Sequence, residues 1–221
     1  MKTFNHVKTE LGYDDLPCFT RETGRTYISP DRKTEYFSIT TILEKLARPH
    51  INAWKERIGL EEANKILFRS SRRGTSVHEA IEKYLNNDPD YLIGYMPNII
   101  ENFLSIKPLL QRIGNIYGQE TALYSDHLGV AGRVDCVADF DGVPSIIDFK
   151  TSMKPKKREW CESYFKQECF YSIAWEERTG MNIPQLVTIM AVDNNPPQLY
   201  IEQRDVWVHP LQEAIKYFKN N

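Results

Sequence analysis

The spacing of apolar residues divides the chain into a first half with a helical period and a second half in which strands dominate. Over residues 40–69 the apolar residues fall three or four positions apart, which predicts two or three short helices with a break at Pro49. Two more helices are predicted over residues 75–85 and 97–113. Residues 1–40 mix turn residues with short β-prone runs, and we expect an irregular arm or a small hairpin there.

Three short runs rich in Val, Ile, Tyr and Phe follow, and they predict an antiparallel meander. The runs cover residues 115–124, 129–140 and 143–150, and Asp141-Gly142 between the last two is typical of a tight hairpin. A long amphipathic helix, two more strands and a last helix are predicted over residues 158–178, 186–192, 199–203 and 210–218. This order of elements predicts an α/β sandwich with a mixed sheet.

Composition and charge narrow the class of protein. With 221 residues, of which 41% are hydrophobic and 26% charged, the chain can bury a substantial core. A net charge of -2 disfavours coating of nucleic acid by bulk positive charge, so any DNA-binding surface must be local. No run approaches the roughly 18 apolar residues of a membrane span, and residues 1–10 lack the apolar run of a secretory signal. We therefore expect a cytoplasmic protein without a membrane partner.

The cysteines are scattered along the chain and form no CxxC pair. They are Cys18, Cys136, Cys161 and Cys169. The last two lie in a predicted helix, where eight residues correspond to about 12 Å of rise, too far for a disulfide. We expect buried free thiols rather than metal ligands or disulfides.

The clearest chemistry lies in residues 132–152, where Asp135, Asp148 and Lys150 occupy two strands of the predicted hairpin. Asp148 and Lys150 are two apart and therefore point to the same side of their strand. Pairing across the turn brings Asp135 towards the same end of the sheet. Such a group can hold one or two Mg²⁺ ions and orient a water for attack on a phosphodiester. The simpler alternative is a surface salt bridge between Asp148 and Lys150.

Four motifs, in their order and spacing, resemble those of a known nuclease group. They are RGTSVH at residues 73–78, GRVD at 132–135, IDFKT at 147–151 and QECFY at 167–171. The group is the RecB-type branch of the PD-(D/E)xK nuclease superfamily, in particular its stand-alone mitochondrial and phage-encoded exonucleases. The resemblance covers about residues 38–192.

This resemblance implies a restriction-endonuclease-like core, in which helices flank a mixed central sheet, with an N-terminal helical extension. We expect an arm and helical extension over residues 1–72 and a nuclease core over residues 73–221, packed as one compact domain. The cell would be a bacterium or a phage-infected host.

The resemblance also implies a site for one or two Mg²⁺ or Mn²⁺ ions. Its ligands would be His78, Asp135, Asp148 and the backbone carbonyl of Phe149. Glu120 is an additional candidate ligand, the alternative being an exposed strand charge. Judged alone, His78 would be interpreted as a core histidine with a hydrogen-bond partner. An imidazole in the ligand set suits Mn²⁺ as well as Mg²⁺.

The catalytic set implied by the resemblance is Asp135, Asp148, Lys150, Gln167 and Tyr171. Lys150 would orient or deprotonate the attacking water, or offset charge on the phosphate. Gln167 and Tyr171 are four apart and share a helix face, and they would position Lys150 or the DNA backbone. Their alternative is the polar edge of an amphipathic helix.

Two basic clusters flank these motifs and predict the DNA contacts. The expected DNA-binding residues are Arg72, Arg73, Thr75, Arg133, Thr151, Ser152, Lys154, Lys156 and Lys157. A charge run can equally be a solvated face. Trp54 and Tyr36 could stack on unpaired bases, although aromatic residues in such contexts more often belong to the core.

The sequence therefore predicts a metal-dependent DNA exonuclease, with single-stranded ends as the preferred substrate, in replication, recombination or repair. The alternatives are a structure-specific endonuclease of the same fold and a non-catalytic DNA-binding scaffold for replication or recombination. No late cysteine triplet is present for an iron-sulfur cluster, and no GxxxxGK[ST] loop for ATP. We expect a monomer with DNA as its partner and with replication or recombination proteins as further candidates.

Overall fold

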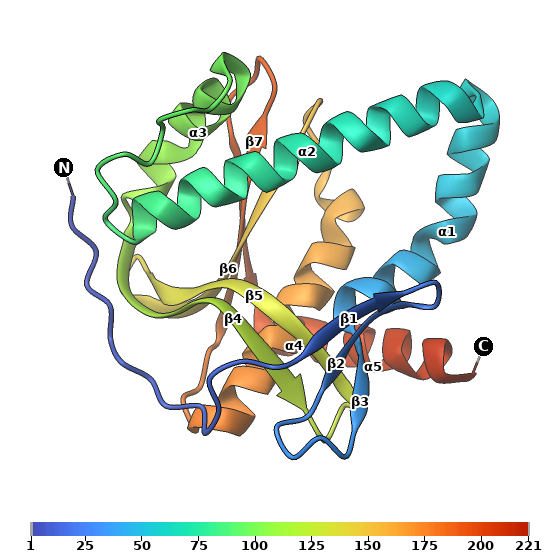
Figure 1. The fold of residues 1–221 in the computed structure, drawn as a ribbon, viewed down its shortest axis with the longest axis vertical. Helices are drawn as coiled ribbons and strands as arrows, with labels where there is room; N and C mark the ends of the chain where they lie inside the picture. The colour runs from blue at the N-terminus through green and yellow to red at the C-terminus, as the bar shows by residue number, and fades with distance from the viewer. Residues whose placement is uncertain (1, 221) are drawn as a thin grey trace.

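A mixed sheet of eight strands runs through the centre of the computed structural model, which describes residues 2–220, and helices cover both of its faces (Figure 1). The strands are β1 (Cys18–Arg21), β2 (Gly24–Ile28), β3 (Glu35–Ser38), β4 (Ile113–Ser125), β5 (Val130–Phe140), β6 (Val143–Ser152), β7 (Gln185–Val192) and β8 (Gln198–Gln203). The helices are α1 (Ile39–Ile58), α2 (Leu60–Leu85), α3 (Pro97–Leu110), the 3-10 turn η1 (Arg158–Cys161), α4 (Glu162–Thr179) and α5 (Arg204–Asn220). The predicted α/β class is confirmed.

The sheet order is β1-β2-β3-β5-β6-β7-β8, and β4 pairs with β5 along the other edge of that strand. The β3–β5 and β6–β7 pairs are parallel and the others antiparallel. The β5–β6 hairpin turns at Asp141-Gly142, where both residues have positive φ (53° and 81°), as a type I′ turn requires. The predicted hairpin is therefore confirmed.

Strand β5 has different neighbours at its two ends, and this leaves a fork in the sheet. Its last residues pair with β6, from Phe140↔Val143 back to Cys136↔Ile147. Its first residues, Val130 and Ala131, pair with β3 instead. Beyond Ile147, β6 has β7 on one side and no paired strand on the other. Backbone groups at this fork need other partners, and the motif residues lie there.

Two apolar cores form on the two faces of the sheet. On one face α2 and α3 pack their apolar sides, including Val77, Ile81 and Phe103, against Ile147 and Phe149 of β6. On the other face α1, α4 and α5 pack against residues such as Val134, Ile146 and Met190. Because alternate residues of β6 point to opposite faces, Asp148 and Lys150 point towards α4.

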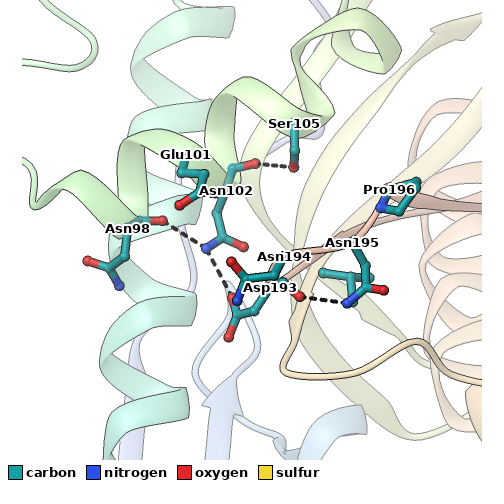
Figure 2. A pocket seen from close by; sticks show the side chains of 9 residues that line it. Asn98, Glu101, Asn102, Ser105, Asp193, Asn194, Asn195 and Pro196 are labelled. Carbon is teal, nitrogen blue, oxygen red and sulfur yellow. Dashed lines mark hydrogen bonds between the residues drawn. The ribbon is translucent and has the colours of Figure 1, made fainter.

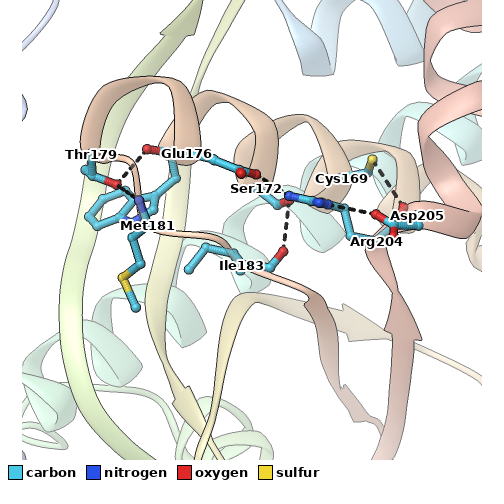
Figure 3. Close-up of polar contacts among 9 residues, drawn as sticks. Cys169, Ser172, Glu176, Thr179, Met181, Ile183, Arg204 and Asp205 are labelled. Carbon is cyan, nitrogen blue, oxygen red and sulfur yellow. Dashed lines mark hydrogen bonds and ion pairs between the residues drawn. The ribbon is translucent and has the colours of Figure 1, made fainter.

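Helix α4 is fixed at its far end by polar contacts with the segments around it (Figure 3). Arg204, the first residue of α5, forms an ion pair with Glu176, and Ser172 Oγ donates to the carbonyl of Ile183 at 3.2 Å. Thr179 Oγ1 donates to the carbonyl of Trp175 at 2.8 Å. The first two contacts join the second half of α4 to neighbouring segments, and the third lies within α4. The first half of the same helix carries Gln167.

The first half of the chain differs from its prediction in three places. The predicted break at Pro49 is wrong, because α1, a helix of 20 residues, includes this proline in its interior. One proline removes a single helical hydrogen bond and can be accommodated within a longer helix. The break comes instead at Gly59, and residues 60–69 continue into the helix predicted over residues 75–85 as one helix, α2, of 26 residues, in which Gly74 costs only about 1 kcal/mol. The N-terminal hairpin extends into three strands that join the main sheet.

The expected division after residue 72 falls inside α2, and it stays a prediction. All four cysteines are free as predicted, but only three are buried, because Cys18 is exposed on the edge strand β1. Among the described residues, no helix has both the length and the apolar content to cross a membrane.

Candidate active site

The site forms at the fork between β5 and β6. Among the described residues, no strand pairs with β6 there on the β5 side, and side chains bond its backbone groups instead. The backbone N–H of Phe149 donates to Asp135 Oδ2 at 2.9 Å, and the Phe149 carbonyl accepts from His78 Nε2 at 2.6 Å. His78 Nδ1 lies 3.5 Å from Asp135 Oδ2. The backbone N–H and C=O of one residue, Phe149 of β6, thus join Asp135 of β5 and His78 of α2.

Asp148 and Lys150 form an ion pair on the α4 side of β6. Asp148 is 2% exposed, and Gln167 Nε2 of α4 donates to its Oδ1 at 3.0 Å. The expected pairing of Asp148 with Lys150 is present, but it is buried rather than a surface salt bridge. Gln167 contacts Asp148 and not Lys150, so the amide orients the carboxylate of the pair.

The ligand trio is the set of His78, Glu120 and Asp135, whose ligand atoms all lie within 4.8 Å of one another. Glu120 stands opposite Asp135, between the paired residues Gln119–Cys136 and Thr121–Val134. Its φ of 48° is a left-handed conformation that costs about 1–3 kcal/mol for a residue with a side chain. Arg133 donates to the Glu120 carbonyl and holds this strained backbone in place.

Burial changes the protonation of both carboxyl groups that face Asp135. Burial, followed by the charges of Asp135 and Glu82, raises the pKa of Glu120 to about 7. Burial also raises the pKa of Asp148 to about 6; Lys150 lowers it and Asp135 raises it further. For Lys150, burial lowers the pKa, but Asp148 and Asp135 outweigh it and hold the pKa above its ordinary value. A divalent cation at the trio would relieve the repulsion among these carboxylates.

A pocket of about 400 Å³ opens over the trio, and sequence reasoning missed three of its lining residues, Arg25, Glu79 and Glu82. Glu82 lies four residues after His78 on α2, and Arg25 comes from β2. The spacing of His78 and Glu82 places them on one helix face, which was a usable signal. Arg25 had none, because the pairing that brings β2 here is long-range.

Beneath the site lie two buried residues of α4. Tyr171 is 1% exposed and packs against Gly132, where an added Cβ would stand 2.9 Å from its ring. This close approach explains the glycine of the GRVD motif. Glu168 is fully buried and accepts a hydrogen bond from Thr188 Oγ1 of β7. Burial, with the charge of Asp148, raises the pKa of Glu168 well above its ordinary value. Sequence reasoning did not select Glu168.

The nine residues predicted to contact DNA fall into three groups: residues engaged within the protein, two threonines near the site, and exposed cations. Some are engaged within the protein: Arg73 pairs with Asp193, Arg133 with Asp15 and the Glu120 carbonyl, Ser152 bonds the backbone of Lys154, and Lys156 bonds Tyr164. Thr75 lines the pocket over the trio, and Thr151 is half-buried at the end of β6. Arg72, Lys154 and Lys157 are exposed.

The two aromatic residues considered for stacking differ in burial. Tyr36 is 6% exposed, and its hydroxyl donates to Asp126, so this ring belongs to the core and the stacking interpretation is wrong for it. Trp54 is half-buried on α1.

A larger hollow, of about 660 Å³, lies between α3 and the turn after β7 (Figure 2). Four asparagines and two acidic residues are among its lining residues, and Asn102 Nδ2 donates to Asp193 Oδ1 at 3.2 Å. Asp193 also pairs with Arg73, which ties this turn to α2. The hollow lacks a histidine and a lysine beside its carboxylates, so we place the chemistry at the trio.

Fold and site together define an α/β protein with an imidazole–carboxylate trio beside a buried Asp–Lys pair. No family model matches the chain. It is 30% identical over 158 residues to mitochondrial genome maintenance exonuclease 1 of Mus musculus, covering 64% of this chain and 47% of that protein. The Homo sapiens protein of the same name is 27% identical over 132 residues, covering 54% and 37%. The chain thus spans less than half the length of these relatives.

A solved structure from Eubacterium rectale, named "Putative exonuclease", also matches, with a TM-score of 0.46 and 15% identity over 67% of this chain and 64% of that one. The sequence similarity to the mitochondrial exonuclease confirms the predicted resemblance to mitochondrial exonucleases, whereas the assignment to the PD-(D/E)xK superfamily stays a prediction.

Proposed function

We propose that this protein is a metal-dependent DNA nuclease of the PD-(D/E)xK type, which degrades DNA from single-stranded ends in replication, recombination or repair. The observation that carries the proposal is the ligand trio at the fork, with the buried Asp148–Lys150 pair on the next strand. Similarity to a mitochondrial exonuclease supports the same activity. The intact set argues against a scaffold, because burying charged groups is costly unless they serve the site.

The donor set fits a hard divalent cation. His78, Glu120 and Asp135 would hold Mg²⁺ or Mn²⁺, with the Phe149 carbonyl and Asp148 beside them. The ion would polarise the scissile phosphate and lower the pKa of a bound water. Glu120 is half-buried, and its ligand atom lies within 4.8 Å of those of His78 and Asp135. This position supports the ligand role over that of an exposed strand charge.

Lys150 acts on the phosphate as a charged group. Asp148 and Asp135 hold its pKa above the ordinary value, so the ammonium stays protonated at neutral pH. This supports orienting the water and offsetting charge on the transition-state phosphate, rather than removing a proton from the water. Gln167 fixes Asp148, and Asp148 in turn fixes the ammonium.

The exposed cations give a local basic surface around the end of β6. Arg72 lies on α2, and Lys154 and Lys157 follow β6, so they would contact phosphates on either side of the reacting one. A Cβ built on Gly74 would lie 3.9 Å from Thr151 Oγ1, which places α2 directly over the strand end.

The deciding experiment uses 5′- and 3′-labelled single-stranded oligonucleotides with Mg²⁺, Mn²⁺ or EDTA. We expect degradation with either metal and none with EDTA. A circular single strand should resist, because an exonuclease needs an end; cutting of the circle would instead identify an endonuclease. Binding of DNA without hydrolysis under every metal condition would identify the scaffold.

A further inference from the structure

The segment that follows β6 presents a large apolar ring to solvent next to the site. Trp160, in the 3-10 turn η1, is 62% exposed, and Met153, three residues after Lys150, is 52% exposed. A single exposed apolar side chain needs no explanation by itself. Here the ring has a specific set of charged neighbours.

Four basic residues precede Trp160 on the segment after β6: two are bonded to other side chains of the protein, and two are exposed. Lys156 is bonded to Tyr164, and Arg158 forms a two-pronged ion pair with Glu202. Lys157 Nζ instead lies 5.6 Å from the centre of the Trp160 ring, and both Lys157 and Lys154 are exposed. An exposed indole beside one exposed lysine, with a second exposed lysine on the same loop, matches a single-stranded nucleic acid, in which bases alternate with phosphates.

The backbone that carries Trp160 is anchored close to the site. The backbone N–H of Trp160 donates to the carbonyl of Lys157 at 3.0 Å, and the next residue, Cys161, is fully buried. Tyr164, four residues later, lies with its ring centre 5.1 Å from Lys150 Nζ. Four helical residues rise about 6 Å, so Trp160 stands one turn from the ring that contacts Lys150.

We propose that Trp160 stacks on an unpaired base of the DNA strand, while Lys154 and Lys157 contact the flanking phosphates. This inference rests on the proposed nuclease function and deepens it, because a base in a duplex has no free face for the ring. Trp160 is thus a substrate-binding residue, and its ring makes the protein bind single-stranded DNA more tightly than duplex DNA.

The first test measures binding of a fluorescent single-stranded oligonucleotide by anisotropy in EDTA, where no hydrolysis occurs. Trp160→Ala should weaken binding about tenfold, which is the typical loss for one stacked base. Trp160→Phe should stay within about threefold of wild type because it keeps a ring, whereas Trp160→Leu should behave like alanine. Phe19→Ala removes another exposed ring, on β1, and serves as the control.

The second test moves a single abasic site along the oligonucleotide. Wild type should lose affinity at one position, and Trp160→Ala should lose nothing more there, because ring and base form one interaction. Independent losses at every position would overturn the stacking proposal. So would equal binding by Trp160→Ala and wild type while both degrade DNA. Failure of wild type to bind or degrade any DNA would instead refute the nuclease proposal itself.

Discussion

The site has two halves, and both contain carboxyl groups, which are partly exposed in one half and buried in the other. The ligand half is the trio of His78, Glu120 and Asp135, with the His78 side chain 29% and the Asp135 side chain 13% exposed under the pocket. The buried half is Asp148, Gln167 and Glu168, whose exposures are 2%, 9% and 0%. Lys150 extends from the buried half, and its side chain is 21% exposed.

This difference assigns different tasks to four carboxyl groups. In the ligand half, Glu120 and Asp135 repel each other, and a cation between them relieves that repulsion. Asp148 is neutralised by Lys150 and oriented by Gln167. Glu168 has only the Thr188 hydroxyl, and burial favours its neutral form. Mutations in the two halves should therefore fail in distinguishable ways.

The largest effect should come from the pair that links the halves. Lys150→Ala and Asp148→Asn should each lower kcat on single-stranded DNA by about 100- to 1,000-fold, because each removes charge organised for the transition state. Excess Mn²⁺ should not restore the rate. Asp148→Asn is preferable to Asp148→Ala, because asparagine keeps the shape and one oxygen acceptor of the carboxylate and leaves no cavity. Removing either charge of a buried pair can cost about 3–5 kcal/mol of stability, so folding must be checked in both variants.

Circular dichroism melting provides the control for that experiment. Glu162→Gln, an exposed change at the start of α4, should match wild type in rate and melting temperature. Substantial activity in folded Lys150→Ala would remove Lys150 from the mechanism.

Changes in the ligand half should act through metal affinity. Glu120→Gln and His78→Ala should raise the Mn²⁺ concentration for half-maximal rate by about 10- to 100-fold, with partial recovery in excess metal. Titration calorimetry with Mn²⁺ alone should give the same shift without DNA. Glu62→Gln, exposed in the first turn of α2, is the matched control. A rate that stays low at saturating metal would place these residues with the buried half.

The third prediction concerns stability and measures the contribution of Glu168 by itself, because Glu120 and Asp148, whose pKa values are also raised, keep their own contributions in a Glu168 variant. Its folded pKa lies well above the unfolded value, so the native state binds the extra proton, and stability falls as pH rises between the two values. The slope is at most about 1.4 kcal/mol per pH unit for one group. Glu168→Gln should remove this slope, so that its advantage over wild type grows with pH.

Chemical denaturation in EDTA at several pH values measures this difference. Glu162→Gln should follow the wild-type curve. Parallel curves for Glu168→Gln and wild type would show that Glu168 is ionised in the native state.

Local signals were sufficient for the parts of the site that lie on adjacent elements. The Asp141-Gly142 turn fixes the β5–β6 hairpin, and the two-residue spacing of Asp148 and Lys150 fixes their common face. The spacing of Gln167 and Tyr171 placed both on the side of α4 that meets the sheet. Each of these inferences depends on the geometry of one hairpin or one helix.

The features that sequence reasoning missed depend on long-range packing. The pairing of β3 with β5 creates the fork, and no local pattern marks it. The left-handed backbone of Glu120 has no signature in a strand-like run. Glu168 is an acid between Gln167 and Cys169, and nothing in that run shows that it faces β7 rather than solvent.

The smallest predicted effect tests the ring that joins the buried half to the loop. Tyr164 lies 5.1 Å from Lys150 Nζ and 4.8 Å from Lys156 Nζ, measured to its ring centre, and its hydroxyl bonds Lys156. A cation–π contact contributes about 0.5–2 kcal/mol, so Tyr164→Leu should lower kcat by roughly threefold with little change in KM. Tyr164→Phe keeps the ring over Lys150 and should retain the wild-type kcat. If both variants lose activity equally, the hydroxyl contact with Lys156 positions the loop, and the ring does not act on Lys150. If only the leucine variant loses activity, the same ring holds the catalytic lysine one turn away from Trp160.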